Sequence, residues 1–325
     1  MSRNEPGRCG GVSLERQRGV ALISVLLVVA VVVAVGAALL REQDQQRRRT
    51  AALLHGGQAL RYLTALDDWA AVVLERDRND GTTDTLSENW ALKLVPMAVD
   101  GGLLGGELED AQGRFNLNNL VVEGEFNASE QARFVRLMEA LDISSARSED
   151  IADALRDWID EDQTESGPGG GEDYYYLGLP LPYRTAARPL AAASELRLLR
   201  GVDAEIWRAL APYVVALPGY RPVNVNTAPE PVLRSLSAHI DEARAQDILD
   251  ERLSGAFDNG RAFLDFIGET TEADAIAADS IAVGSDYFLL KAQVAVGEAQ
   301  LRGTALIRRD EQSAVVLRRA LGEAL

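Results

Sequence analysis

The chain has 325 residues, with a hydrophobic fraction of 47% and an aromatic fraction of 6%, which supports a packed core in one large or two small domains and argues against wholesale disorder. The formal net charge is -17, from 50 acidic and 33 basic residues, so the surface repels phosphate and argues against general nucleic-acid binding, while it offers carboxylates to a hard cation such as calcium. The lone cysteine, Cys9, excludes an internal disulfide and a cysteine metal cluster.

A short basic leader is followed by a long uncharged segment at the N-terminus. Residues 20–40 form a run of 21 residues without a charged side chain. A helix of that length spans about 31 Å, which matches the roughly 30 Å core of a bilayer, whereas a cleaved secretory signal has an apolar region of only about 7–15 residues. We therefore predict one transmembrane helix over residues 20–40. Arginine is in equal excess on both flanks, so the positive-inside rule alone does not orient this helix.

The junction Arg18-Gly19-Val20 resembles a prepilin-type signal, which prepilin peptidase cuts on the cytoplasmic side after the glycine. The resemblance implies that residues 1–19 are a leader peptide and that the mature chain begins at Val20. The fifth mature residue is then Ser24, where pilins and most pseudopilins carry glutamate. A carboxylate inside the bilayer costs about 2.5–3.5 kcal/mol unless it is paired, and in pilins the implied partner is the terminal amine of a neighbouring subunit. A subunit at the tip has no subunit ahead of it, so Ser24 agrees with a tip position.

Beyond the apolar segment the helical pattern continues. Leucine and valine recur at three-to-four spacing, and no proline occurs between residues 20 and 95, so residues 41–78 are predicted to be the amphipathic continuation of one long helix outside the membrane. Apolar stretches separated by turn residues then predict antiparallel strands at both ends of the remaining chain. These stretches are residues 92–99, 103–115, 287–296, 300–307 and 314–319.

The middle of the chain is different, because residues 127–282 show mainly helical periodicity. Helices enclosed by strands favour an α-domain inserted into a β-domain. We therefore predict an α+β fold in which residues 79–126 and 283–325 together form an antiparallel β-domain and residues 127–282 form the inserted helical domain.

Carboxylates cluster on both sides of a glycine-rich segment, Gly167-Pro-Gly-Gly-Gly171, which is expected to be a flexible loop. Carboxylates this close repel one another, and at a helix C-terminus they also meet the negative end of the helix dipole. A divalent cation with six to eight oxygen ligands would offset this, and calcium suits the site better than zinc because no Cys or His is nearby. The EF-hand spacing is absent, and a solvated acidic loop remains the alternative. The acids are Asp157, Asp160, Glu161, Asp162, Glu165, Glu172 and Asp173.

Several motifs in combination resemble the K-type minor pseudopilins of the type II secretion system. The motifs are Arg114-Phe-Asn-Leu-Asn-Asn-Leu120, Trp158-Ile-Asp-Glu-Asp162, Glu172-Asp-Tyr174, Pro182-Tyr-Arg184 and Ser194-Glu-Leu-Arg197. The resemblance covers most of the chain and implies a pilin-like β-domain with an inserted SAM-like α-domain that binds two calcium ions. The resemblance implies that Asp160, Asp162, Glu165, Glu172 and Asp173 are calcium ligands, but it does not indicate where the second ion binds.

Residues 223–236 and the charged stretch that follows are similar to the helix-hairpin-helix module of DNA-binding competence proteins. In that module a glycine hairpin offers backbone amides to phosphate. Here the hairpin position, Ser237-Ala-His-Ile-Asp241, has no glycine and adds an acid, and the nearby arginines are scattered among acids. We therefore expect a structural helix-hairpin-helix and no nucleic-acid partner.

The resemblance implies a tip subunit of the type II secretion pseudopilus, anchored in the inner membrane by a single span with its head in the periplasm. The implied partners are the minor pseudopilins I, J and H, the major pseudopilin G and prepilin peptidase. The two histidines, His55 and His239, have no serine or cysteine signature beside them, and no phosphate-binding motif occurs, so we expect no enzyme. Two alternatives remain: a minor pilin of a type IV or competence pilus, and a membrane-anchored calcium-dependent periplasmic hydrolase.

Overall fold

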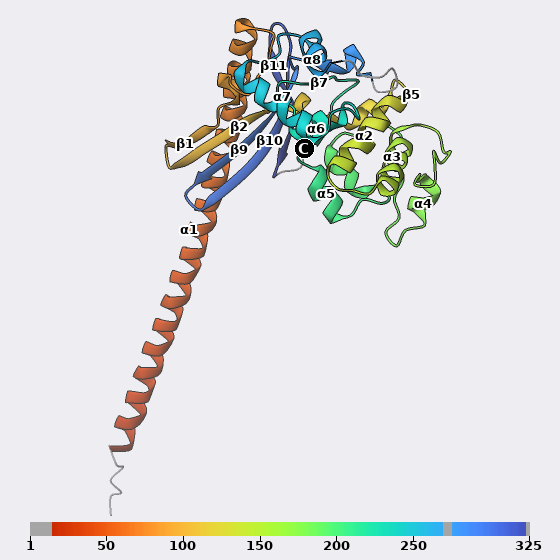
Figure 1. Cartoon of the computed structure of the whole chain (residues 1–325). Helices are drawn as coiled ribbons and strands as arrows, with labels where there is room; N and C mark the ends of the chain where they lie inside the picture. Colours follow the sequence, from red (N-terminus) through yellow and green to blue (C-terminus); the bar gives the residue numbers. More distant parts are fainter. Residues whose placement is uncertain (1–14, 269–274, 323–325) are drawn as a thin grey trace, which may run out of the picture. The chain divides into compact units, whose positions relative to one another are not determined.

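The computed structural model describes residues 15–268 and 275–322, with side chains described from Val20 onward (Figure 1). The chain divides into two compact units, Met1–Gly57 and Gln58–Leu325. Residues 1–14, which make up most of the predicted leader peptide 1–19, lie outside the described residues, as do residues 269–274 and 323–325.

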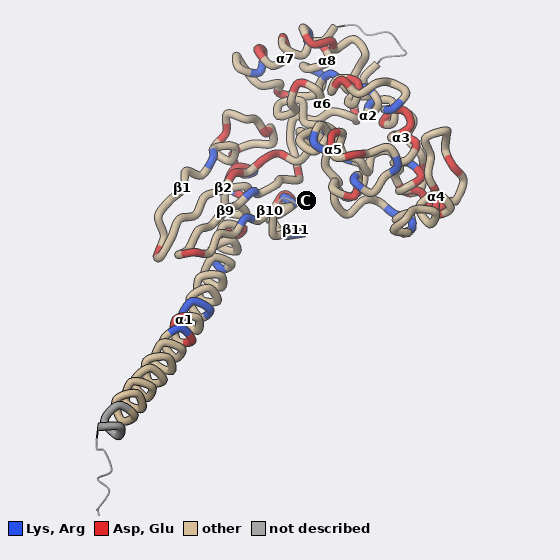
Figure 2. The backbone as a smooth tube through the Cα atoms, turned by 90° about the horizontal axis from the view of Figure 1, so that it is seen from below, with Lys and Arg blue, Asp and Glu red and all other residues tan. Residues whose placement is uncertain are grey.

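The first unit consists of the N-terminal part of helix α1, which runs from Glu15 to Asp80. Its apolar residues from Val20 to Leu40 are almost all exposed, and an 18-residue window has a mean hydropathy of 3.1 and none of its surface buried. Figure 2 shows this uncharged stretch, followed by a band of charged residues farther along the helix. The prediction of a long N-terminal apolar helix is confirmed, and its length and composition suit one membrane span.

The second unit contains the rest of α1, which packs on an antiparallel sheet. Five residues spaced three or four apart are buried by no less than 93% of their surface, as expected for the apolar stripe of an amphipathic helix. They pack against the alternate residues of the strands that face the helix, which form one hydrophobic cluster with them. The buried helix residues are Ala59, Leu63, Leu66, Ala70 and Leu74.

The sheet has the strand order β1-β2-β9-β10-β11, and every neighbouring pair is antiparallel. Leu108 of β2 lies opposite Leu290 of β9, so strands from the two ends of the soluble chain are direct neighbours (Figure 1). The predicted strands at both ends are therefore confirmed as one antiparallel sheet. The strands are β1 (Leu94–Val99), β2 (Gly102–Asp110), β9 (Tyr287–Val296), β10 (Ala299–Arg309) and β11 (Ala314–Leu321).

The elements between β2 and β9 are mostly helices. Several begin with a side-chain cap: Asn127 accepts the N–H groups of Ser129 and Glu130 at the start of α2, and Asp203 and Asp241 cap α5 and α7. The helices are α2 (Ala128–Ala140), α3 (Ser145–Ile159), α4 (Asp173–Leu177), α5 (Ala204–Leu210), α6 (Glu230–Ser235), α7 (Glu242–Ser254) and α8 (Gly260–Ile267). The 3-10 helices are η1 (Asn89–Ala91), η2 (Ala111–Gly113), η3 (Leu117–Leu120), η4 (Ala193–Leu198) and η6 (Ala278–Ser280).

Short strands tie distant parts of this helical region together. β3 pairs in parallel with β6, and β7 pairs in parallel with β8, while β4 and β5 form a small antiparallel pair. The short strands are β3 (Phe115–Asn116), β4 (Val121–Val122), β5 (Glu125–Phe126), β6 (Val214–Val215), β7 (Val223–Asn224) and β8 (Ile281–Ala282).

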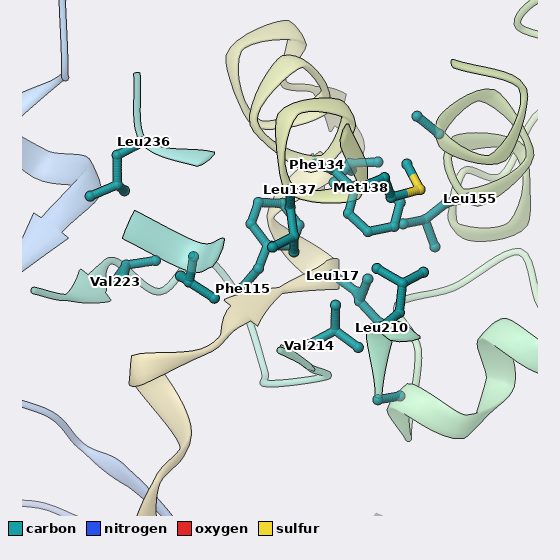
Figure 3. Close-up of a cluster of buried hydrophobic side chains, with 14 of the residues drawn as sticks. Phe115, Leu117, Phe134, Leu137, Met138, Leu155, Leu210, Val214, Val223 and Leu236 are labelled. Carbon is teal, nitrogen blue, oxygen red and sulfur yellow. The ribbon is translucent and has the colours of Figure 1, made fainter. Parts of the chain in front are cut away.

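A second hydrophobic core fills the helical region, separate from the core under the sheet. Figure 3 shows Phe115 and Phe134 at its centre, with Leu137, Leu155 and Leu210 from three helices around them. The rings of Phe115 and Phe134 are stacked with centroids 5.4 Å apart, and both side chains are fully buried. This core holds α2 and α3 in place, and α3 leads into the acidic segment.

The asparagines of the segment Arg114–Leu120 have a structural role. Asn118 is 2% exposed, and its Nδ2 donates to the carbonyl oxygens of Leu190 and Leu217 at 3.1 and 2.9 Å. Its Oδ1 accepts the N–H of Leu190 at 2.8 Å. The side-chain amide of Asn118 therefore supplies hydrogen bonds to backbone groups of two loops, at Leu190 and Leu217, which lie outside the strands.

Candidate metal centre

Helix α3 delivers the first carboxylates to the centre. Ile151, Leu155 and Trp158 bury one face of the helix, and the helix ends at Asp160, whose N–H donates to the carbonyl oxygen of Arg156 at 3.0 Å. The Asp160 side chain is 13% exposed, and its Oδ2 lies 3.9 Å from Nε of Arg156, which is beyond hydrogen-bond distance. The end of α3 therefore places a mostly buried carboxylate in the site, and its ion pair with Arg156 is longer than a hydrogen bond.

The glycine-rich segment packs directly against α3, which corrects the expectation of a free flexible loop. Gly169, Gly170 and Gly171 are buried. A Cβ added at Gly167 would overlap the carboxylate of Asp153, and a Cβ at Gly169 would overlap the α3 backbone. The glycines are present because the loop approaches the helix too closely for any side chain.

Three of the five predicted ligands come together at the end of this loop. One carboxylate oxygen from each of Asp160, Asp162 and Glu172 lies within 4.8 Å of the others. Glu172 is 3% exposed, while Asp162 is exposed and accepts the N–H of Thr164 at 2.7 Å through Oδ1. Figure 2 shows acidic residues gathered around α3 and α4.

The electrostatics of these carboxylates are unfavourable without a cation. Both oxygens of Glu172 and Oδ1 of Asp160 are buried and have no hydrogen-bond partner among the described residues. Burial and, to a smaller extent, the nearby charges of Asp157, Asp160 and Asp162 together raise the pKa of Glu172 to about 8. Burial, together with the charge of Asp162, likewise raises the pKa of Asp160 to about 6. Buried carboxylate oxygens without donors match the hard oxygen ligands that calcium takes.

The other two predicted ligands lie differently. Asp173 uses its carboxylate within the chain: Oδ1 accepts the N–H and the hydroxyl of Thr185 at 3.0 and 3.2 Å, and Oδ2 is 3.2 Å from Nη1 of Arg184. Asp173 thereby closes the loop between α4 and Thr185. Glu165 is exposed and is not in the group of three. A ligand role for either residue stays a prediction.

Two residues that shape the centre received no role from the sequence. Asp157 is fully buried and accepts the N–H groups of Ser166 and Gly171. Arg200 donates from Nη1 to the carbonyl oxygen of Gly170 at 2.6 Å, and its guanidinium lies 4.8 Å from the centroid of the Tyr175 ring. Asp157 could have been singled out as the carboxylate on the buried face of α3, whereas nothing local marks Arg200, because its contact spans 30 residues.

The predicted processing site lies at the edge of the described region. The backbone of Gly19 is part of α1, and Val20 begins the residues whose side chains are described. The hydroxyl of Ser24 donates to the carbonyl oxygen of Val20 at 2.9 Å, so this polar group is satisfied within the apolar helix. Cleavage after Gly19 stays a prediction.

The α6–α7 pair contains the arginines of the helix-hairpin-helix resemblance, and each has a contact within the chain. Arg234 lies 3.2 Å from Glu230, and Arg244 lies 3.6 Å from Asp247. Arg252 Nη1 donates to the carbonyl oxygens of Val225 and Ala228 at 2.7 and 2.9 Å. These guanidinium groups make contacts within the chain, and the absence of a nucleic-acid partner stays a prediction.

Comparison with known proteins identifies the family. Residues 113–219 and 223–284 match two models described as "Type II secretion system (T2SS), protein K". The type II secretion system protein K of Pseudomonas aeruginosa is 37% identical over 316 residues, which covers 94% of this chain and 93% of that protein. The protein K of Pectobacterium carotovorum is 32% identical over 324 residues, covering 94% of this chain and 97% of that protein.

A solved structure has a similar fold. It is one chain of the crystal structure of the GspK-GspI-GspJ complex from the enterotoxigenic Escherichia coli type 2 secretion system. The TM-score is 0.72 at 28% sequence identity, and the match covers 87% of this chain and 99% of that chain. With its long apolar helix, its antiparallel sheet and these matches over nearly its full length, the chain belongs to the type II secretion system protein K family.

Proposed function

We propose that the protein is a minor pseudopilin at the tip of the type II secretion pseudopilus, where it initiates and caps the assembly used for protein export across the outer membrane. The observation that carries the proposal is the match to 99% of a chain from a GspK-GspI-GspJ complex at a TM-score of 0.72. The exposed apolar part of α1 supports it, because a single span of this kind would hold the protein in the inner membrane with its head in the periplasm.

The mechanism is assembly rather than catalysis. Prepilin peptidase would remove residues 1–19 and leave Val20 as the first residue of the apolar helix. The head would join minor pseudopilins I and J, with H and the major pseudopilin G adding below. The helical region between β2 and β9 is bulky, and this gives a steric reason for a cap. The same proposal includes the predicted domain boundaries, with residues 127–282 inserted between residues 79–126 and 283–325. The inserted domain would have a SAM-like fold that contains a structural helix-hairpin-helix.

Calcium would be the ion of the acidic centre. Glu172, Asp160 and Asp162 would hold it through carboxylate oxygens, and two of these residues supply buried oxygens without partners among the described residues. The bound charge would neutralise repulsion at the end of α3. It would thereby stabilise the loop and the start of α4.

Two measurements test the assembly proposal. Mass analysis of the chain produced with and without prepilin peptidase should give a product that starts at Val20 only when the peptidase is present. The processed protein should then elute as one complex with minor pseudopilins I and J of the same bacterium. An unprocessed N-terminus, or heads that elute separately from both partners, would count against a tip pseudopilin.

The alternatives make different predictions. A DNA-uptake pilin should bind DNA more weakly as salt increases, and the internally paired arginines of α6 and α7 lead us to expect no binding. A periplasmic hydrolase should keep its activity after deletion of the anchor, whereas a tip subunit should lose its secretion function.

A further inference from the structure

Asp157 is a buried carboxylate of α3 that lies beside the cation ligands. Its side chain is fully buried. Oδ1 accepts the N–H of Ser166 at 3.0 Å, and Oδ2 accepts the N–H of Gly171 at 2.8 Å. Ser166 and Gly171 are the two ends of the glycine-rich loop, so one carboxylate holds both ends of it.

Two further hydrogen bonds fix the loop, one within the loop and one from Arg200. The N–H of Gly170 donates to the carbonyl oxygen of Gly167 at 3.1 Å, and Arg200 holds the carbonyl oxygen of Gly170 at 2.6 Å. A Cβ added at Gly170 would overlap Oδ2 of Asp157. The conformation of the loop therefore depends on close contact between its backbone and the Asp157 carboxylate.

The position of Glu172 follows from this contact. Glu172 comes directly after Gly171, whose N–H is bound to Asp157, and it places two buried oxygens opposite Asp160 and Asp162. We propose that Asp157 is a positioning residue of the cation site, which holds the loop so that Glu172 faces the two aspartates of the α3 end. This inference rests on the proposed calcium site. Groups that orient metal ligands typically change metal affinity by about 10–100-fold when they are removed.

Two substitutions test the inference from the two sides of the contact between Asp157 and the loop. Asp157→Asn keeps the shape of the side chain, but its amide group would face a backbone N–H that needs an acceptor. Gly170→Ala keeps every carboxylate, but its Cβ would occupy the position of Oδ2 of Asp157 and so disrupt the contact between the loop and that carboxylate. Calorimetric titration of CaCl₂ into the full-length protein in detergent should show a dissociation constant raised by about 10–100-fold for each variant. Glu149→Gln removes the same charge from an exposed position of α3, and it should change the constant by less than about twofold, because exposed charges are screened.

The double variant separates positioning from direct ligation. If Asp157 acts through the loop, adding Asp157→Asn to Gly170→Ala should raise the dissociation constant little further, because the loop is already displaced; independent effects would multiply. Circular dichroism in EGTA should show that each variant is folded. If Asp157→Asn does not fold, the calcium affinity of Gly170→Ala tests the inference instead.

A wild-type protein that binds no calcium would remove the proposed cation site and this inference with it. A wild-type protein that binds calcium while Asp157→Asn or Gly170→Ala binds it equally well would overturn the inference alone. Fully multiplicative effects in the double variant would also overturn it.

Discussion

Glu172 carries a carboxylate into the interior without a hydrogen-bond partner among the described residues. Because burial and then repulsion from Asp157, Asp160 and Asp162 destabilise its charged form, Glu172→Gln should raise the melting temperature of the protein in EGTA. The same change should remove the stabilisation by calcium, which for a single site is about 2.7 kcal/mol at 100 times the dissociation constant. Thermal denaturation of the full-length protein with CaCl₂ and with EGTA measures both effects.

Glu149→Gln is the matched control, because Glu149 is an exposed glutamate of α3. It should melt as the wild type does in both buffers. A Glu172→Gln variant that keeps the full calcium-dependent shift would show that this side chain is not a ligand.

Asp110 is a second buried carboxylate, but it is well supplied with donors. It accepts hydrogen bonds from the hydroxyls of Thr227 and Ser285 at 2.6 and 2.7 Å and from Nδ2 of Asn224 at 2.9 Å. Burial nevertheless raises its pKa from 3.8 to about 6. The folded state then prefers the protonated form more strongly than the unfolded state does. The contribution of Asp110 to stability is therefore fully present below pH 3.8 and is lost as the pH rises through 6.

Asp110→Asn should flatten this pH dependence. The difference between wild type and variant in the free energy of unfolding should change by about 2 kcal/mol between pH 4 and pH 7. Urea denaturation at several pH values in EDTA measures the change, and the exposed Asp258→Asn serves as a control. A constant difference across this range would show that Asp110 does not titrate there.

At the scale of elements, Arg309 of β10 joins three parts of the chain. Its side chain is 1% exposed, and its guanidinium contacts Asp77 of α1 at 2.7 Å and Asp84 of the following segment at 2.6 Å. It also donates to the carbonyl oxygen of Ser285 at 2.8 Å. Removing one partner of a buried ion pair leaves an uncompensated charge and costs about 3–5 kcal/mol.

Arg309→Met should therefore lower the free energy of unfolding by about 3–5 kcal/mol in urea denaturation. Arg308→Met is the matched control, because Arg308 is the preceding residue of the same strand and is exposed. It should change the free energy of unfolding by less than about 0.5 kcal/mol. Equal effects of the two substitutions would show that the buried network contributes little.

The regular elements could be predicted because their patterns are local. The alternation along residues 287–296 and 300–307 predicts β9 and β10, and the leucine spacing beyond residue 40 predicts the buried face of α1. The two-residue strands β3 and β6 could not be predicted, since two residues carry no period and their pairing joins Phe115 to Val214, which lie on either side of helices α2 to α5 in the sequence.

The candidate site could be predicted in part, because some of its residues are also close together in the sequence. Asp160 and Asp162 are close in sequence, and the glycine-rich segment indicates the turn that returns Glu172. The contact of Asp173 with Thr185 depends on the tertiary fold, so spacing alone could not separate it from the ligands. The packing of the glycines against α3 also requires the fold, because low complexity is equally typical of free loops.

At the scale of the whole molecule, the chain combines two units with opposite surface chemistry. The first exposes apolar side chains from Val20 to Leu40, which suits a bilayer, and the described residues of the second bury apolar side chains in two large hydrophobic cores and a smaller cluster. The second unit starts at Gln58, inside α1 and well beyond the apolar segment. The rest of α1 therefore belongs to the head, because its leucines form part of the core under the sheet.

This division predicts how truncation affects the head. A chain that starts at residue 51 keeps all the α1 residues buried under the sheet, and it should be soluble without detergent and unfold cooperatively in urea. A chain that starts at residue 75 loses Leu63, Leu66 and Leu74. Each buried leucine contributes about 1.5–3 kcal/mol, so their sum approaches the whole stability of a typical domain, about 5–15 kcal/mol.

The shorter chain should therefore aggregate or lose its near-ultraviolet circular dichroism, since it exposes the sheet face that includes Leu108 and Leu290. Size-exclusion chromatography and urea denaturation of the two truncated chains compare them under the same conditions. A soluble, cooperatively unfolding chain from residue 75 would show that the sheet and the helical region fold without α1. In that case α1 would serve only the membrane and the assembly, because its leucines would contribute nothing that the head requires.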